Sequence, residues 1–272
     1  PINNGQYKIL YCPLLIGVTS FYSTALKVTT NCNILMPDNS NDVTPINNGQ
    51  YKILYLLHGL SGNAEEWLRF TKLEYYAKKF GYIIVLPEAG RSFYTNIDGI
   101  QYATYIAEEL PNYLKQWFKI PTQKENTFVA GESMGGYGAL KIGMTYPSQY
   151  LSIAALSPVI HLGELRCLVE DKIFEEMDTT EIDRIINQKD YFDIYKYLDH
   201  DSNKVYPSII QLCGTEDFLI ESNRKFYGFA KNKIDITYRE LAGDHEWPVW
   251  DIAIQKALQY FEKYDIDHFK LY

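Results

Sequence analysis

Short apolar runs alternate with helical stretches along most of the chain, and this alternation limits the possible folds more than any other feature. From Ile53 onward the runs are short and nearly continuously apolar, which is typical of strands buried on both faces of a sheet. Strands are expected at residues 26–36, 51–57, 82–86, 127–130, 152–156, 208–213 and 235–240, and helices at 73–80, 102–118, 135–145, 222–229 and 249–264. The alternation predicts an α/β protein with a mostly parallel central sheet flanked by helices.

Two segments disturb this pattern. Pro111 is expected to kink the second of the helices or to begin a turn within it. Residues 161–206 are rich in Asp, Glu, Lys and Tyr and contain no clear strand. We expect this segment to be an insertion of short helices, which forms either a cap over a site or a solvated excursion of the surface.

The N-terminal part of the chain contains an exact duplication. The segment PINNGQYKILY occurs at residues 1–11 and again at 45–55, with no further similarity beside it. A structural repeat would continue at a fixed period, so we interpret residues 1–20 as an artificial or atypical extension. The apolar run from Ile9 to Val18 is interrupted by Pro13 and makes a poor signal-peptide core. Residues 21–272 are then expected to form a single domain.

Charge and cysteine content narrow the class of function. The net charge of −8 argues against nucleic acid and anionic membranes as main partners and suits a small neutral substrate. No apolar run approaches the ~18 residues of a membrane-spanning helix. The four cysteines, at positions 12, 32, 167 and 213, form no CxxC pair. We therefore expect neither a metal nor a redox site, and buried free thiols at Cys32 and Cys213.

The segment TFVAGESMGG, at residues 127–136, carries the clearest chemical signal. An apolar strand runs into Gly-x-Ser-x-Gly, and a helix begins at once. A turn this tight excludes side chains at Gly131 and Gly135, and it lifts the Ser133 hydroxyl to the edge of the sheet at the positive end of the helix. The pattern predicts a nucleophile elbow in an α/β-hydrolase fold, the alternative being a glycine-rich turn with a capping serine.

A serine hydroxyl is a weak nucleophile and needs a base. In this fold the chain order is serine, acid, histidine, with the histidine in the loop after the last core strand. His245 fits that place, since it lies between the last expected strand and the C-terminal helix. The turn after the preceding strand offers Asp217 and Glu216, of which we favour Asp217. We therefore predict that Ser133, Asp217 and His245 are catalytic.

Backbone N–H groups are expected to stabilise the negative charge that forms on the attacked carbonyl oxygen. One should come from Met134, directly after the nucleophile, and the other from a loop after an early strand. The segment YLLHGLSG at residues 55–62 fits that loop, so we assign the second donor to Leu60. We expect His58 to brace this loop rather than to take part in catalysis.

Several aromatic residues lie near these motifs and could line a pocket or pack in the core. We predict substrate contacts for Trp67, Tyr94, Asn96 and Trp247, and note Phe93 and Trp250 beside them. For Asn96, capping a turn is the alternative to bonding a polar group of the substrate.

Taken together, these motifs resemble the putative-esterase family of α/β hydrolases, which includes the esterase D type and bacterial tributyrin and acetyl esterases. The matching segments run in family order over residues 21–262: FYSTALKVTTNCNILMP, LYLLHGLSGNAEEW, LPEAGRSFYTN, IAEELPNYL, FVAGESMGGYGALKI, CGTEDFL and GDHEWPVWD. The resemblance implies cytoplasmic hydrolysis of short-chain acyl esters, often acetyl groups on sugars, without a cofactor. It also supports Ser133, Asp217 and His245 as the triad and Leu60 with Met134 as oxyanion donors.

Some features depart from the family pattern and leave alternatives open. Ser61 and Gly62 follow His-Gly-Leu here, unlike the S-formylglutathione hydrolase branch, and Phe93 stands where the family often has Trp. The alternatives are a feruloyl or acetyl-xylan esterase, an S-formylglutathione hydrolase, an acyltransferase with the same triad, and a non-catalytic binding domain. A small-molecule ester is the expected partner, and a homo-oligomer remains open.

Overall fold

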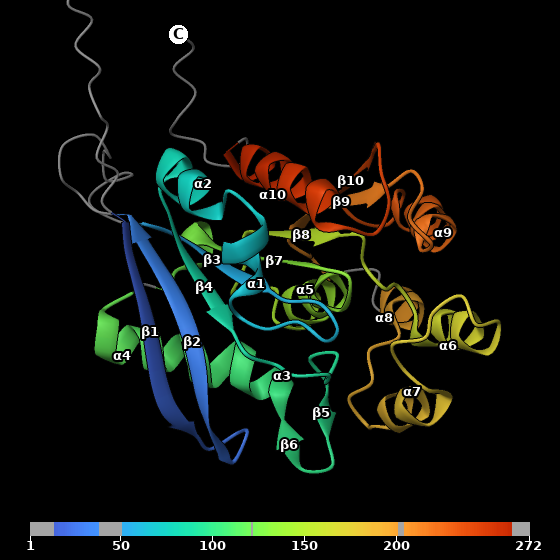
Figure 1. The fold of residues 1–272 in the computed structure, drawn as a ribbon, viewed down its shortest axis with the longest axis horizontal. Coiled ribbons are helices and arrows are strands. Elements are labelled where there is room, and N and C mark those ends of the chain that lie inside the picture. The colour runs from blue at the N-terminus through green and yellow to red at the C-terminus, as the bar shows by residue number, and fades with distance from the viewer. Residues whose placement is uncertain (1–13, 38–50, 121, 201–203, 263–272) are drawn as a thin grey trace, which may run out of the picture.

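Eight strands form one mixed sheet in the computed structural model, which describes residues 14–37, 51–120, 122–200 and 204–262 (Figure 1). Their order across the sheet is β1-β2-β4-β3-β7-β8-β9-β10. Strands β3, β4, β7, β8, β9 and β10 are parallel, whereas β2 pairs antiparallel with both β1 and β4. The bounds are β1 Leu14–Ser23, β2 Val28–Pro37, β3 Lys52–Leu57, β4 Tyr82–Pro87, β7 Thr127–Glu132, β8 Ser152–Leu156, β9 Ser208–Gly214 and β10 Ile236–Leu241. The expected α/β-hydrolase architecture is confirmed.

Helices cover both faces of this sheet. One hydrophobic core lies between the sheet and α1 (Glu66–Phe70), α2 (Leu73–Phe80) and α10 (Trp247–Glu262). The core on the opposite face involves α4 (Leu110–Phe118), α5 (Met134–Thr145) and α9 (Ile220–Ala230). Every residue of the central strands β3, β4, β7, β8 and β9 is buried, as their continuous apolar character predicts.

The edge strand β1 was not predicted. It pairs with β2 over its whole length, so the boundary expected at residue 20 falls inside a strand. Ile16, Val18 and Tyr22 are exposed on it, at 42%, 68% and 62% of their surface. The strand therefore lacks the buried apolar face that would identify it in the sequence. Residues 1–11 and most of the second PINNGQYKILY copy lie outside the described residues.

The expected helix at 102–118 is a continuous helical run with a local irregularity. It consists of α3 (Tyr102–Thr104), a π-helical turn (Tyr105–Glu109) and α4, whose first turn contains Pro111. Proline lacks the N–H that an α-helix would use at that place, and a wider π turn accommodates the missing bond. The disturbance expected at Pro111 is thus present, in the turn that precedes it.

The segment 161–206 contains the short helices α6 (Leu162–Glu170), α7 (Thr179–Ile186) and α8 (Ile194–His200), as predicted. Figure 1 shows them gathered on the side of the molecule away from the β1–β2 hairpin.

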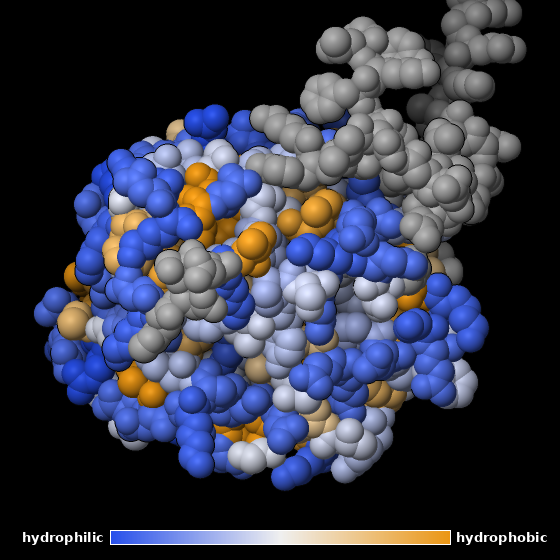
Figure 2. Space-filling model, turned by 180° about the vertical axis from the view of Figure 1, so that it is seen from behind, coloured by the Kyte–Doolittle hydropathy of each residue, from blue (hydrophilic) through white to orange (hydrophobic). Residues whose placement is uncertain are grey.

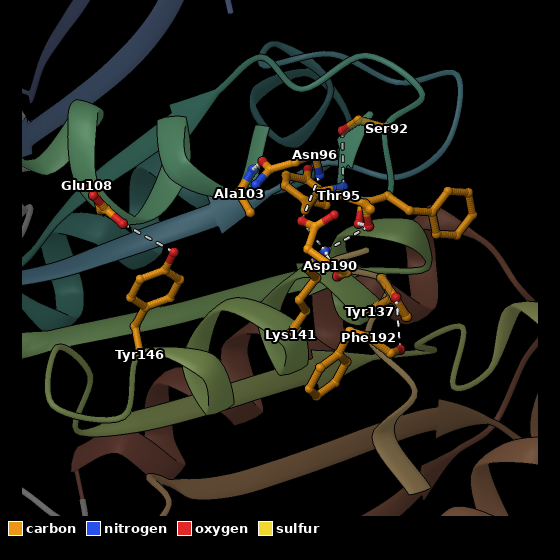
Figure 3. A network of polar contacts seen from close by, with 12 residues as sticks. Ser92, Thr95, Asn96, Ala103, Glu108, Tyr137, Lys141, Tyr146, Asp190 and Phe192 are labelled. Atoms are coloured by element: carbon orange, nitrogen blue, oxygen red, sulfur yellow. Dashed lines mark hydrogen bonds and ion pairs between the residues drawn. The ribbon is translucent and has the colours of Figure 1, made fainter. Parts of the chain in front are cut away.

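A buried lysine ties this segment to α5 (Figure 3). Lys141 Nζ donates to Thr95 Oγ1 at 2.9 Å and to the Asp190 carbonyl oxygen at 2.9 Å, and it lies 3.3 Å from Asp190 Oδ2. Burial lowers the pKa of Lys141 to about 8, against the opposing influence of Asp190.

Among the described residues, no helix is both long and apolar enough to cross a membrane. Figure 2 shows one face of the molecule, on which hydrophilic residues dominate and hydrophobic residues appear in separate small groups. The described cysteines Cys32, Cys167 and Cys213 are free, and Cys32 and Cys213 are buried as expected.

Candidate active site

Ser133 occupies the turn between β7 and α5 in a strained backbone conformation. Its φ of 53° and ψ of −115° lie where L-amino acids are rarely found, at a typical cost of about 1–3 kcal/mol. A Cβ at Gly131 would overlap the Gly135 carbonyl, and one at Gly135 would overlap the backbone of Leu57. The sequence folds in this way because only glycine leaves room on both sides of the serine.

The Ser133 side chain does not cap the helix that it begins. Its Oγ lies 2.9 Å from His245 Nε2, and His245 Nδ1 lies 2.8 Å from Asp217 Oδ2. The three residues are contributed by the ends of β7, β9 and β10, which meet at one edge of the sheet because these strands are parallel. The structure therefore brings together the three residues that the motifs predict to be catalytic.

Asp217 is buried, and its second oxygen accepts a hydrogen bond from Leu219 N–H at 2.8 Å. Burial by itself would raise the pKa of Asp217, but hydrogen bonding to His245, the charge of that ring and the Leu219 N–H together hold it below its ordinary value. An ionised carboxylate therefore faces His245 Nδ1. The neighbouring Glu216 has an exposed side chain, as expected for adjacent residues that point in different directions.

Met134 and Leu60, the expected oxyanion donors, belong to the start of α5 and to the loop after β3. Met134 is the first residue of α5, so its N–H has no acceptor within the helix. Leu60 lies in the loop after β3 and lines a pocket that Ser133 also lines. His58 braces this loop, because its Nδ1 lies 2.8 Å from the Gly59 carbonyl oxygen and its Nε2 accepts the Ala89 N–H at 3.0 Å. These contacts fix a neutral ring, and burial lowers the pKa of His58 accordingly.

A family model described as putative esterase matches residues 23–261. The chain belongs to the putative esterase family. An acetyl esterase of Caldicellulosiruptor saccharolyticus is 29% identical over 262 residues, which cover 90% of this chain and 97% of that protein. The resemblance inferred from the motifs is confirmed, and the chain is a carboxylesterase.

Solved structures of related hydrolases agree with the fold of this esterase. An S-formylglutathione hydrolase of Staphylococcus aureus superposes with a TM-score of 0.77 at 26% identity, covering 92% of this chain and 99% of that one. The fluorophosphonate-binding serine hydrolase F of the same organism gives a TM-score of 0.80 at 26% identity, covering 92% and 98%.

A pocket of about 760 Å³ opens in front of the esterase's Ser133 and His245. Its aromatic walls are Phe174, Phe218, Trp247 and Trp250. Phe218 and Trp250 also contact the His245 ring, at centroid distances of 4.6 Å and 5.0 Å. Trp247, for which a substrate contact is predicted, lines this pocket, and Phe174 brings the 161–206 insertion to it.

Three of the four residues predicted to contact substrate lie elsewhere. Trp67 is fully buried in α1, where its Nε1 donates to the Leu57 carbonyl at 3.2 Å. Tyr94 is fully buried and donates to the His58 carbonyl at 2.9 Å. The Asn96 side chain accepts the Ala103 N–H at 2.9 Å, which is the turn-capping alternative (Figure 3). The prediction is corrected for these three residues, of which Trp67 and Tyr94 support the backbone at Leu57 and His58 and Asn96 supports a turn.

The motifs did not identify Glu132, the residue before Ser133, as part of the site. Glu132 is among the residues that line the pocket, with 2% of its surface exposed, and its carboxyl group packs against Gly59 and accepts the Gly59 N–H. Burial raises its pKa to about 8, and the neighbouring Glu66 and Glu176 add to the shift. The sequence feature that could have identified Glu132 is a carboxyl group at the end of an otherwise apolar strand.

This pKa predicts how the stability of the esterase depends on pH. Between the ordinary pKa of 4.5 and about 8, folded Glu132 keeps a proton that the unfolded chain releases. The free energy of unfolding therefore loses up to about 1.4 kcal/mol per pH unit through this window. Glu132→Gln keeps an acceptor for the Gly59 N–H but removes the titrating group, so its free energy of unfolding should not fall through this window. Its stability advantage over wild type should therefore be absent below pH 4.5 and largest from pH 8 upward. Urea unfolding of both proteins at several pH values tests this, and parallel stability curves would contradict it.

Proposed function

We propose that this esterase hydrolyses short-chain acyl esters, from acetyl to butyryl and including acetylated sugars, through an acyl-enzyme on Ser133. The proposal depends above all on the position of the His245 ring, 2.9 Å from Ser133 Oγ and 2.8 Å from Asp217 Oδ2. In this arrangement one ring nitrogen can take the hydroxyl proton while the other is held by a carboxylate.

The reaction then proceeds in two halves. Ser133 Oγ attacks the ester carbonyl as His245 Nε2 takes its proton, and the N–H groups of Leu60 and Met134 receive the oxyanion. His245 returns the proton to the leaving alcohol, which departs and leaves the acyl group on Ser133. Water repeats these steps and frees the acid. Asp217 holds the ring in orientation and stabilises its charged form throughout.

Support for a short acyl group comes from the acetyl esterase relative. The pocket has aromatic walls and a volume of about 760 Å³, so an aromatic acyl group such as ferulate also fits and is the second candidate. We further propose that the 161–206 insertion acts as a partial cap, since Ile173, Phe174, Glu175 and Glu176 line the pocket.

A panel of esters that share one alcohol tests the acyl preference. We expect kcat/KM to be highest for acetyl, propionyl and butyryl esters and to fall about tenfold or more at octanoyl, since each misplaced methylene group costs roughly 1–3 kcal/mol. Faster turnover of feruloyl than of acetyl esters would favour the second candidate. Faster turnover of S-formylglutathione than of any oxygen ester would overturn the assignment to short-chain oxygen esters.

A further inference from the structure

The pocket in front of Ser133 has an unusual charge. Six of its lining residues are acidic, and they come from α1, the end of β7, the segment after α6 and the loop that carries His245: Glu66, Glu132, Glu175, Glu176, Asp244 and Glu246. Among the described residues that line the pocket there is no lysine or arginine, and His245 is the one histidine.

Glu132 keeps its proton up to about pH 8, so the negative charge of the pocket at neutral pH comes from the other five acidic residues. Within the described part of the chain, none of the six forms a salt bridge with a basic side chain. Arg91 contacts two residues that line the pocket: its guanidinium donates to Ser61 Oγ at 2.8 Å and to the Glu176 carbonyl oxygen at 2.6 Å. Its charge is already paired with the Glu181 carboxylate, at 2.7 Å and 2.8 Å.

The acidic groups also influence one another. Burial raises the pKa of Glu66, and the charges of Glu88 and Glu176 raise it further. Such mutual repulsion means that the pocket has a negative potential before any substrate enters. A cleft lined by charges of one sign and by apolar walls concentrates that potential.

The aromatic walls favour the same kind of ligand. Trp247 and Trp250 pack edge to face, with ring centroids 5.1 Å apart, and Phe174 stacks on Phe218 at 5.6 Å. All four rings line the pocket beside the carboxylates. The faces of aromatic rings attract ammonium groups, most strongly where water is partly excluded.

We propose that this pocket selects its ester by charge, favouring an alcohol component that carries an ammonium group and rejecting one that carries a carboxylate. The inference rests on the proposed function and gives it a substrate class. An acetylated amino alcohol or amino sugar with a free amine belongs to the favoured class. A glutathione thioester carries two carboxylates and one ammonium group, and its net negative charge places it in the rejected class.

Three acetate esters of similar size test the proposal. They are 4-(aminomethyl)phenyl, 4-(hydroxymethyl)phenyl and 4-(carboxymethyl)phenyl acetate, in which a methylene group insulates the leaving oxygen from the charge. In water, a single charge 4 Å from the charge of the ester changes kcat/KM by about fivefold, and several carboxylates act together here. We expect kcat/KM to fall in the order amine, alcohol, carboxylate, with a total span of about thirtyfold or more at low salt. The span should shrink severalfold in 0.5 M salt.

A matched pair of variants shows where the selection arises. Glu175→Gln/Glu176→Gln removes two pocket charges and should narrow the span between the amine and the carboxylate ester. Glu74→Gln/Glu125→Gln removes the same charge from exposed positions outside the pocket lining, on α2 and in the turn before β7, and should keep the wild-type span. An equal narrowing in both variants would show that net charge, and not the pocket, sets the preference, and would overturn the proposal.

The same assay separates this inference from the proposed function. Equal kcat/KM for the three esters, or fastest turnover of the carboxylate, overturns charge selection alone. If wild-type protein does not turn over the uncharged ester, the proposed function is overturned and this inference with it. The same follows if Ser133→Ala turns over that ester at the full wild-type rate.

Discussion

The Ser133→Ala variant is expected to lower kcat for p-nitrophenyl acetate by roughly 10⁶-fold, because it removes the hydroxyl group that lies 2.9 Å from His245 Nε2. The Leu60 and Met134 N–H groups and the pocket remain, so a residual acceleration of about 10³–10⁴ over water should persist. Steady-state turnover at neutral pH measures this loss.

Ser148→Ala provides the matched control for this prediction. Ser148 is exposed, just beyond the C-terminal end of the helix that Ser133 begins, and its replacement should leave kcat unchanged. Thermal unfolding of both variants should stay close to wild type, since the Ser133 N–H keeps its bond to the Leu156 carbonyl oxygen. Substantial turnover by a folded Ser133→Ala protein would remove Ser133 from the nucleophile role.

Asp217→Asn should lower kcat by about 10⁴-fold with little change in folding. An amide can occupy the space of the carboxylate, but it is uncharged, and it either donates or accepts a single hydrogen bond with His245. It therefore holds His245 in the wrong tautomer and leaves the charged ring of the transition state unstabilised. The assay with p-nitrophenyl acetate, together with unfolding curves, checks both parts of this expectation.

Glu216→Gln is the control, because Glu216 is adjacent in the chain but exposed. We expect its rate to remain within about twofold of wild type. Near-normal turnover by Asp217→Asn together with a large loss in Glu216→Gln would transfer the orienting role to Glu216.

Much of the fold could be predicted because its central strands are buried on both faces. Burial leaves continuous apolar runs in the sequence, and these located β3, β4, β7, β8 and β9 within a few residues. The partly exposed strands β2 and β10 were also expected within a few residues of their places. Ser133, Asp217 and His245 could be brought together from sequence because parallel strands end at one edge of the sheet. The turn at Ser133 was equally clear, since its glycines are required by steric overlap alone.

The rest depended on contacts that a sequence does not reveal. A buried aromatic side chain and a pocket wall both need apolar neighbours, so Trp67 and Tyr94 could not be told apart from Trp247 and Trp250. Asn96 serves a turn whose partner, Ala103, is known only from the fold.

The acidity of the pocket was hidden for a related reason. Its acidic residues come from four segments that are distant in the chain and adjacent only in the folded protein. The net charge of −8 indicated a neutral substrate, but it could not show where the negative charge gathers.

The central claim is that Ser133 forms a covalent bond with the substrate's acyl group. Reaction with a fluorophosphonate probe, followed by peptide mass spectrometry, tests it most directly, since such probes capture an activated serine. We predict one adduct, on the peptide that contains Ser133, in the native protein. The adduct should be absent from native Ser133→Ala and from wild-type protein unfolded before labelling. Labelling at another residue, or equal labelling of Ser133→Ala, would contradict the account.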